Sequence, residues 1–162
     1  MKLVMITGCA GFIGSYVTKA CLKRGWQVYG VDNFTYAGSR QFIDKMKKKY
    51  DNFFNVAAET HVGNSIVDST NFIRSNIDGV KNLLDLIRIK PSNVQQPPIF
   101  FHFSTDEVYG DIIEGEHVEE DLLNPSNPYS ASKASADLLI KAWARTYGIK
   151  YVILRPTNNY GI

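Results

Sequence analysis

The first thirty residues constrain the fold of this chain more than any other segment. An apolar run at 2–6 leads into a turn with three glycines, and apolar side chains then recur at helical spacing up to Gly25. A second apolar run follows at 27–31. A strand, a glycine turn, a helix and a second strand make one βαβ unit. Because the first run shows no alternation of polar and apolar residues, we expect a strand buried on both faces of a parallel sheet.

Later segments repeat the alternation of strands and helices. Residues 53–57, 99–104 and 151–154 are short apolar runs that indicate strands, and the basic stretch 39–49 indicates a helix. A long acidic loop, 111–127, follows the strand at 99–104. This order predicts an α/β fold of three layers, a doubly wound, Rossmann-like parallel sheet. In such sheets, ligands bind outside the carboxyl ends of the strands.

Two longer helices are predicted from their apolar faces. The first begins at Asp68 or Ser69 and is closed by Pro91. Its apolar stripe consists of Ile73, Ile77, Val80, Leu84 and Ile87. The second has Pro128 in its first turn and ends at Gly148. The face that its residues share consists of Ala131, Ala134, Leu138 and Ala142.

Composition and charge exclude several classes of protein. A net charge of +2 argues against a nucleic-acid-binding surface, and the lysines at 45–49 fit the exposed face of a helix. No stretch reaches the ~18 consecutive apolar residues of a membrane-spanning helix. The two cysteines, Cys9 and Cys21, form neither a disulfide framework nor a metal site. We therefore expect a single cytoplasmic domain that holds no metal and binds neither nucleic acid nor membrane.

The glycine turn has the spacing of a dinucleotide-binding site. Gly8, Gly11 and Gly14 follow a strand and open a helix, so backbone N–H groups can approach a pyrophosphate at the positive end of the helix dipole. Asp32 ends the second strand, where its carboxylate can accept hydrogen bonds from ribose hydroxyls. The same charge repels the extra phosphate of NADP, so the pattern favours NAD. The alternative is that Asp32 only initiates a turn.

A tyrosine and a lysine one helical turn apart are the first catalytic candidates. Tyr129 and Lys133 lie at the start of the second long helix, downstream of Thr105 at a strand end. Such a pair is a weak signal alone, since residues at i and i+4 neighbour each other on any helix, but here it follows a nucleotide loop. A lysine ammonium and a bound nicotinamide would lower the pKa of the phenol. Tyr129 could then take a proton from a sugar hydroxyl while hydride leaves for NAD.

Taken in chain order, the motifs resemble those of the extended short-chain dehydrogenase/reductase family and, within it, the dTDP-glucose 4,6-dehydratases. The matching stretches are 7–14, 31–38, 56–61, 72–76, 104–111, 129–133 and 157–161. The dipeptide Asp106-Glu107 carries the distinction from the epimerases of this family, which have small or neutral residues there. The resemblance implies an NAD-dependent lyase that converts dTDP-glucose to dTDP-4-keto-6-deoxyglucose and water, and that recycles NAD in every turnover.

The resemblance also implies roles for individual residues. Asp106 is the acid and Glu107 the base of water removal across C5 and C6, because two carboxyl groups in different protonation states can divide that work. Thr105 hydrogen-bonds the C4 oxygen, and Tyr129 and Lys133 carry out the opening oxidation. The implied cofactor contacts are Gly8, Gly11, Phe12, Ile13, Gly14, Asp32, Asn33, Phe34, Thr35, Ala57, Ala58, Glu59, Ser75, Tyr129, Lys133 and Asn159. The implied substrate contacts are Thr60, Thr105 and Asn158.

Partners and rival functions follow from the same resemblance. It implies a homodimer paired through the helices that carry residues 70–90 and 129–147. Two other functions stay open: a dehydratase or epimerase of this family that acts on UDP- or GDP-sugars, and a non-catalytic NAD-binding fragment. Among the histidines, His61 could approach the sugar, His102 is expected in the core, and His117 is expected in solvent.

The sequence departs from the family's pattern in two places. Family members run to a greater length, and this chain stops at Ile162, where the family passes into a sugar-nucleotide-binding lobe. Between Asp32 and residues 56–58 the family also has an extra strand and helix, which are absent near residue 50. The missing strand would lie at the edge of the sheet, so the topology survives its loss. Either these differences are real, or the sequence is part of a longer chain with a seam near 49–51.

Overall fold

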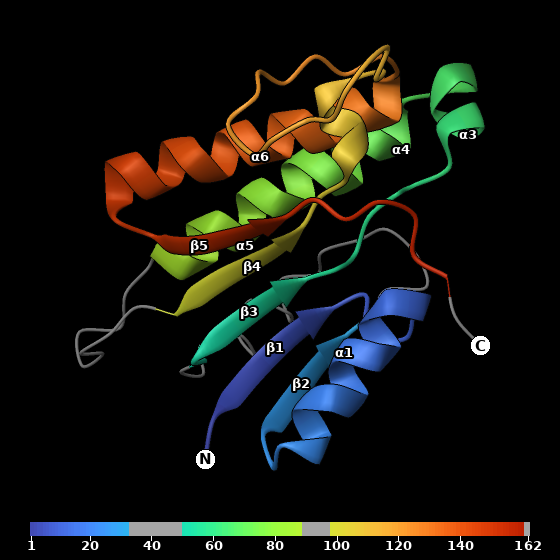
Figure 1. Ribbon diagram of the computed structural model, residues 1–162. Helices are drawn as coiled ribbons and strands as arrows, with labels where there is room; N and C mark the ends of the chain where they lie inside the picture. The colour runs from blue at the N-terminus through green and yellow to red at the C-terminus, as the bar shows by residue number, and fades with distance from the viewer. Residues whose placement is uncertain (33–49, 89–97, 161–162) are drawn as a thin grey trace.

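Five parallel strands form one sheet at the centre of the fold. The computed structural model describes residues 1–32, 50–88 and 98–160. The strands follow the order β2-β1-β3-β4-β5, and every neighbouring pair is parallel. Their bounds are Leu3–Thr7 (β1), Gln27–Val31 (β2), Asn52–Asn55 (β3), Ile99–Phe103 (β4) and Lys150–Leu154 (β5). The predicted doubly wound sheet is therefore confirmed (Figure 1).

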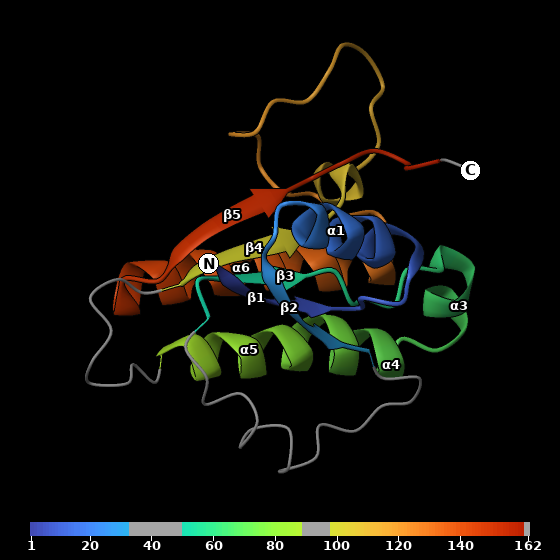
Figure 2. The same cartoon turned by 90° about the horizontal axis from the view of Figure 1, so that it is seen from below.

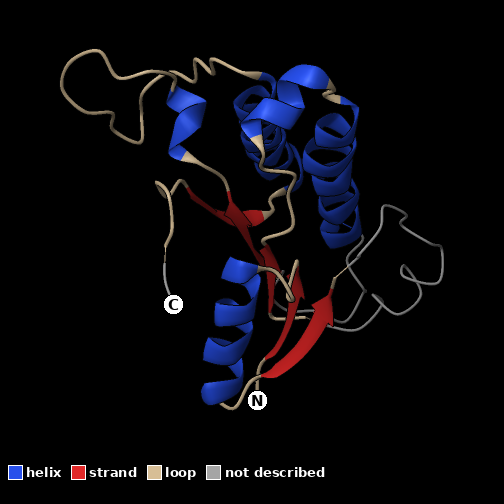
Figure 3. Ribbon diagram, turned by 90° about the vertical axis from the view of Figure 1, so that its right-hand side faces the viewer, coloured by secondary structure: helices blue, strands red, loops and turns tan. Residues whose placement is uncertain are grey.

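Helices cover both faces of this sheet. The helix α1 (Phe12–Lys23) lies on one face, and α5 (Gly79–Arg88) and α6 (Pro128–Tyr147) lie on the other (Figures 1 and 3). Successive side chains of a strand point to opposite faces. Val4 and Ile6 of β1 therefore pack with Cys21 of α1, whereas Met5 packs in the cluster beneath α5 and α6. These two clusters are the cores of a three-layer domain.

The strand β3 is shorter than the sequence predicts. It was expected to continue to residue 57, but it ends at Asn55. The Val56 N–H still donates to the Thr7 carbonyl at 3.3 Å, and the next residue, Ala57, packs against the backbone of Gly8. The chain leaves the sheet at this point because the glycine turn occupies the space beyond the end of β1.

The helical segment that precedes residue 89 has an irregular middle. It consists of α4 (Thr70–Phe72), the π-helical turn η1 (Ile73–Asp78) and α5. A π turn holds more residues than an α turn, so it rotates the inward face. Ile73 is consequently 45% exposed and Asn76 is buried. The predicted apolar stripe is wrong at Ile73, although Val80, Leu84 and Ile87 are buried as expected.

The helix α6 begins and ends at strong signals. The Asn127 side chain accepts from the Ser130 N–H, and the Ser130 hydroxyl accepts from the Asn127 N–H, which together form a capping box. Gly148, with a φ of +69°, ends the helix in the left-handed conformation. The predicted bounds are confirmed, because both the proline start and the glycine stop lie where the sequence places them.

The buried face of α6 differs from the predicted one. Leu138 is 57% exposed and Ala142 is also exposed, whereas Lys133 and Asp137 are buried with Ile140. A search for apolar periodicity misses this face because two of its buried members are charged. Leu138 and Ala142 therefore lie on the exposed side of α6, whereas Ala134, which was predicted to share a face with them, is buried.

Two short helices and a long loop complete the described fold. They are α3 (Val62–Val67) and the 3₁₀ turn η2 (Asp106–Tyr109). The loop 111–127 projects away from the sheet beyond η2 (Figure 2). No helix in the described ranges is long and apolar enough to cross a membrane. The predicted helix at 39–49 and the stop at Pro91 lie outside the described residues.

Candidate active site

The glycine turn forms a cradle that any side chain would fill. Gly8 has a φ of +68°, which favours glycine, and its N–H donates to the Val31 carbonyl at 2.8 Å. A Cβ on Gly14 would lie 1.8 Å from the Gly8 carbonyl oxygen, and one on Gly8 would lie 2.8 Å from the Ala57 nitrogen. The turn is thus closed by contacts between backbone atoms, which leaves the start of α1 free of side chains at these positions.

The start of α1 presents backbone donors, and among the described residues its N-cap supplies no side-chain cap. Its N-cap residue, Gly11, makes no side-chain hydrogen bond, and its first turn holds no acidic residue. Unpaired N–H groups at the positive end of a helix dipole make an anion site. Phe12 and Ile13 follow on this first turn, where Phe12 is 51% exposed. This arrangement fits a pyrophosphate.

Asp32 lies beside this cradle at the end of β2. Its Oδ2 accepts from the Ala10 N–H at 2.7 Å, so the carboxylate is fixed to the glycine turn. It remains partly exposed, which suits an acceptor for ribose hydroxyls. The cradle and this carboxylate together fit an adenosine diphosphate group. The predicted contacts Asn33, Phe34 and Thr35 lie outside the described residues.

The segment after β3 forms the next wall of the site. Ala57 and Ala58 pass the glycine turn, and the backbone of Glu59 is held on both sides by Asn76 of η1. Asn76 accepts from the Glu59 N–H and donates to the Glu59 carbonyl, each at 2.9 Å, and it donates to the Ser132 hydroxyl at 2.8 Å. Asn76 was not among the predicted site residues. The sequence signal that could have found Asn76 is its spacing. It lies four positions from Phe72 and four from Val80, and both of these apolar residues are buried.

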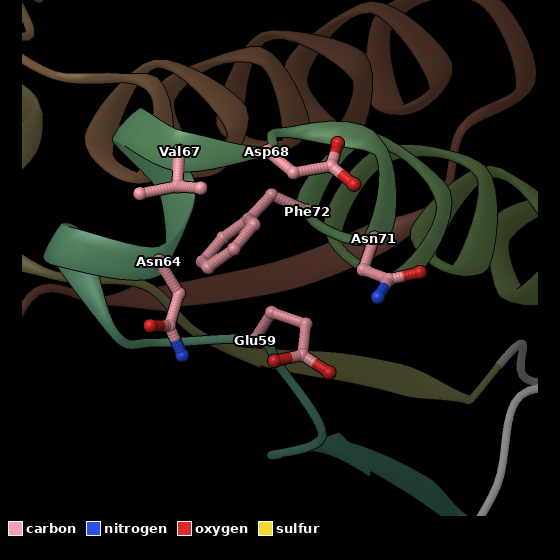
Figure 4. Close-up of a pocket in the computed structure, with 6 residues that line it drawn as sticks. All are labelled: Glu59, Asn64, Val67, Asp68, Asn71 and Phe72. Carbon is pink, nitrogen blue, oxygen red and sulfur yellow. The ribbon is translucent and has the colours of Figure 1, made fainter.

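A pocket of about 270 Å³ lies beside this wall, between α3 and α4 (Figure 4). Its lining residues are Glu59, Asn64, Val67, Asp68, Asn71 and Phe72. Glu59 is the one predicted cofactor contact among them, and none of the five catalytic candidates lines this pocket. Ser75, another predicted contact, is half-buried in η1.

The catalytic candidates of β4 gather in the turn that follows the strand. Thr105 is the N-cap of η2: its hydroxyl accepts from the Glu107 N–H at 3.3 Å and donates to an Asp106 carboxylate oxygen at 3.2 Å. Glu107 in turn accepts from the Asn127 amide at 3.3 Å. Asn127, which was predicted only as the end of a loop, therefore joins η2 to the start of α6.

Tyr129 and Lys133 bring α6 to the same strand end. Both are buried, and the Lys133 Nζ donates to the Phe103 carbonyl, the last of β4, at 2.6 Å. Burial raises the pKa of Tyr129; the Thr105 hydroxyl opposes this, and the charges of Glu107 and Asp106 add to it. These couplings show that Thr105, Glu107 and Asp106 lie close to the phenol.

The two ionisable groups of the pair are both shifted toward their neutral forms. Burial lowers the pKa of Lys133 to about 8, against the attraction of Asp137. Lys133 is not among the causes that shift the pKa of Tyr129. The expectation that the lysine and a bound nicotinamide together lower the phenol pKa stays a prediction; among the described residues, desolvation is the largest effect at Tyr129.

Two of the remaining predicted residues lie on the segment that adjoins η2, where the Asp106 N–H donates to the Pro156 carbonyl at 3.3 Å. Thr60, Asn158 and Asn159 are exposed, and the Asn159 amide donates to the Thr157 carbonyl of its own segment at 3.1 Å. The segment 155–160 extends beyond the carboxyl ends of the strands (Figure 1). In the described part of the chain, no three His, Cys, Asp or Glu side chains gather to hold a metal ion.

The histidines divide between core, cap and loop. His102 is fully buried in β4, as predicted. His61 is exposed and caps α3, where its ring accepts from the Asn64 N–H at 3.2 Å. His117 was predicted in solvent, but it is partly buried: it stacks on Tyr109 and its Nδ1 lies 2.9 Å from an Asp121 carboxylate oxygen.

Comparisons with known proteins agree on one family. A sequence model of the NAD dependent epimerase/dehydratase family matches residues 4–162. The dTDP-glucose 4,6-dehydratase of Neisseria meningitidis serogroup B is 38% identical, over 99% of this chain and 54% of that protein.

Solved structures give the same result. A double mutant of DesIV, a dTDP-glucose 4,6-dehydratase from Streptomyces venezuelae solved with NAD bound, superposes with a TM-score of 0.85 at 33% identity, over 99% of this chain and 57% of that one. UDP-glucose 4-epimerase from Brucella ovis, in complex with NAD, superposes with a TM-score of 0.84 at 26% identity, over 98% and 52%. The chain therefore spans about half the length of the relatives it matches.

The family match includes every part of the candidate site. Residues 4–162 contain the glycine cradle, the turn after β4 and the Tyr129–Lys133 pair. Both structural neighbours hold NAD, and both are enzymes of nucleotide sugars by name. This chain belongs to the NAD-dependent epimerase/dehydratase family.

Proposed function

We propose that this chain is the NAD-binding part of a dTDP-glucose 4,6-dehydratase, a lyase that yields dTDP-4-keto-6-deoxyglucose and water. The observation that carries this proposal is the pair of carboxylates, Asp106 and Glu107, which the η2 turn places beside the phenol of Tyr129. Oxidation of a sugar hydroxyl needs one base. Removal of water needs an additional acid and base, and these two side chains would supply them.

The cofactor would be held at the glycine cradle. Backbone N–H groups at the start of α1 would bind its pyrophosphate, and Asp32 would accept hydrogen bonds from its adenosine ribose. When bound, NAD accepts a hydride from one carbon of the sugar and later returns it to another. The neighbours solved with NAD bound support this assignment.

Tyr129 and Thr105 would perform the first step at C4. Thr105 would hold the C4 oxygen, and Tyr129 would take the C4 hydroxyl proton as the C4–H bond breaks and a ketone forms. Because burial raises the pKa of Tyr129, this step requires a positive charge near the phenol. The Lys133 ammonium would contribute that charge.

Glu107 and Asp106 would then eliminate water. Glu107 would take the C5 proton, which the new C4 ketone makes acidic, and Asp106 would give a proton to the C6 hydroxyl, which leaves as water. The C5–C6 double bond would then take up the returned hydride at C6, and Glu107 would give its proton back to C5. Transfer of the proton from Tyr129 to Asp106 would then restore both residues, so the chain would end each turnover unchanged.

An epimerase is the second candidate, favoured by the structural likeness to UDP-glucose 4-epimerase. Inversion at C4 needs the Tyr129 and Lys133 pair but no acid for a leaving hydroxyl, so it leaves Asp106 and Glu107 without a role. A dehydratase for a UDP- or GDP-sugar would use the same residues. A non-catalytic NAD-binding fragment would use the glycine cradle alone.

The protein would act as a cytoplasmic homodimer paired through α5 and α6. Exposed apolar side chains on this layer support that arrangement: Ile73 of η1 is 45% exposed and Leu138 of α6 is 57% exposed. A covered interface would bury both, at a gain of roughly 25 cal/mol for each Å² of apolar surface removed from water.

Mass spectrometry of the product tests the proposed function. We expect that the protein with NAD converts dTDP-glucose to a product lighter by one water molecule, and that UDP- and GDP-sugars are unchanged. In Asp106→Asn and Glu107→Gln we expect water loss to slow by about 10²- to 10⁴-fold, while NADH absorbance still rises on mixing. A product of unchanged mass would establish epimerisation instead.

A further inference from the structure

A row of buried polar side chains crosses the sheet beneath the candidate site. Thr7, Asn55 and His102 occupy paired positions on β1, β3 and β4. The Thr7 hydroxyl donates to Asn55 Oδ1 at 2.7 Å, and Asn55 Nδ2 donates to His102 Nδ1 at 3.0 Å. All three residues are at least nine-tenths buried. The row leads from the glycine turn toward α6.

This row fixes the direction in which His102 presents its proton. Because Nδ1 accepts a hydrogen bond, the neutral ring carries its N–H at Nε2. Burial holds the pKa of His102 well below its usual range, and the Lys133 charge adds to this effect. The His102 Nε2 lies 3.8 Å from Asp137 Oδ1, and neither atom has a hydrogen-bond partner in the described part of the chain. A neutral imidazole thus turns its N–H toward the carboxyl group of Asp137.

Asp137 is a fully buried carboxyl group between two cations. Its Oδ2 accepts from the Arg155 Nε at 2.9 Å, and Lys133 lies one helical turn earlier on α6. Arg155 is also held by the Tyr109 hydroxyl and by the Glu119 carbonyl. Burial raises the pKa of Asp137, against the attraction of Arg155, the nearby Ser104 hydroxyl and Lys133.

Lys133 is buried one helical turn from this carboxylate, on the same face of α6. The lysine is 2% exposed, and its one described hydrogen bond is to the neutral Phe103 carbonyl. A buried ammonium without a counter-ion tends to lose its proton. Asp137 is the group whose attraction opposes the effect of burial on the pKa of Lys133.

We propose that Asp137 is a positioning residue that acts through Lys133: from the buried face of α6 it supplies the negative charge that keeps the lysine ionised beneath the strand ends. Arg155 holds the same carboxylate at 2.9 Å and helps to keep it ionised. The inference rests on the proposed function for its relevance to catalysis, because Lys133 is the cation expected to assist Tyr129. The charge coupling itself is a property of the protein without substrate.

Side-chain NMR of Lys133 tests this coupling directly. In protein without NAD, labelled at the lysine ε carbons, we expect a titration midpoint near the pKa of about 8. A Lys133→Met variant identifies the signal. Asp137→Asn should lower the midpoint by about one pH unit or more, and Asp137→Glu should restore most of it. Asp85→Asn is the matched control. Asp85 also pairs with a neighbour on its own helix, Lys81, and with an α6 side chain, Trp143, but neither contact involves Lys133 or Asp137.

A second variant keeps the inference falsifiable if Asp137→Asn does not fold. Asp137→Ser also removes the negative charge but leaves a smaller hydroxyl side chain, so it should lower the Lys133 midpoint as Asp137→Asn does. A midpoint that stays at the wild-type value in the variant that folds overturns the role of Asp137.

The pH profile of NAD reduction links the coupling to catalysis. In Asp137→Asn, Lys133 loses its charge at lower pH, so the ascending limb that depends on the Tyr129 phenolate should move to higher pH. A structural role alone would lower the rate without moving this limb. If the wild-type protein reduces no NAD with any nucleotide sugar, the proposed function fails, whereas the NMR titration still decides whether Asp137 sustains the charge of Lys133.

Discussion

Two helices of this protein begin at the carboxyl edge of the same sheet, and they begin in opposite ways. The helix α1 starts at a glycine without a side-chain cap, whereas α6 starts with a complete capping box from Asn127 and Ser130. Within the described ranges, the first N–H groups of α1 have no side-chain cap and can bind a ligand, whereas those of α6 are used by its own residues. The first start is suited to binding an anion, and the second is suited to holding side chains in place.

The surroundings of the two helices differ in the same sense. Around α1, the close contacts are between backbone atoms of the glycine turn and Ala57. Around α6, charged side chains are buried, and their hydrogen bonds join β4, η2 and the end of β5. The comparison teaches that the first region should be sensitive to added volume, and the second to lost polar groups or changed charge.

Gly14→Ala tests whether the α1 region is sensitive to added volume. We expect it to have the largest effect of the substitutions considered. The new methyl group would lie 1.8 Å from the Gly8 carbonyl oxygen, and both atoms belong to constrained backbone. We expect the free energy of unfolding to fall by about 3 kcal/mol, with NAD binding lost, as measured by chemical denaturation and by titration with NAD.

Gly79→Ala is the matched control for this substitution. Gly79 is also helical, and its added Cβ would meet nothing closer than 3.8 Å. The change should leave stability equal or raise it by up to about 1 kcal/mol, because alanine favours a helix over glycine. Equal losses in the two variants would mean that the close contact with the Gly8 carbonyl oxygen does not explain the Gly14 result.

Asn127→Ala tests the α6 side. It removes the acceptor for the Ser130 N–H and the donor to Glu107. We expect a loss of about 1 kcal/mol in the free energy of unfolding, measured by urea denaturation. Asn127→Ser should keep most of this stability, because serine caps a helix equally well, although it cannot reach Glu107. A full loss in the serine variant would mean that the Glu107 contact, and not the cap, stabilises the region.

His102→Gln tests the α6 side through the pH dependence of the free energy of unfolding. We expect the smallest effect here. The pKa of His102 is lowered in the folded protein, so on acidification the unfolded chain takes up the proton first. The stability that the neutral ring contributes is complete above about pH 6.5 and declines below it.

Thermal or urea denaturation at several pH values measures this contribution. From pH 8 to pH 6, the free energy of unfolding should fall further in the wild type than in His102→Gln. The difference between the two falls should stay below about 1 kcal/mol. Asp137, Lys133 and Arg155 are common to both proteins, so their titration cancels in the difference. Parallel pH curves would mean that His102 is not buried as a neutral ring.

Local sequence signals predict the parts of this fold that local physics controls. The βαβ unit, the stop at Gly25 and the bounds of α6 all follow from apolar runs, a proline and glycines, and the structure confirms them. The apolar stripe misses the π turn at Ile73, because a one-residue insertion in helical register leaves no local mark in the residue pattern. Tertiary contacts decide that register.

The sequence predicts which residues form the candidate site. It does not predict how their charges and pKa values influence one another. The structure brings Thr105, Asp106, Glu107, Tyr129 and Lys133 to one strand end, and their roles stay predictions. The supporting residues Asn76, Asn127 and Asp137 were missed, since polar side chains on helices are usually exposed. The raised pKa of Tyr129 likewise follows from the fold rather than from the sequence, because it depends on how completely the fold removes water from the phenol.

The order of the strands has a consequence for how the chain reaches its native state. The strand β1 lies between β2, which follows it closely in the sequence, and β3, which is about twice as far along the chain. Closing the longer loop costs only about 0.6 kcal/mol more for each doubling of its length, but the search for non-local pairs is slow. During that search, a folded βαβ unit has one edge of β1 open to other chains. The yield of refolding should therefore fall as the protein concentration rises.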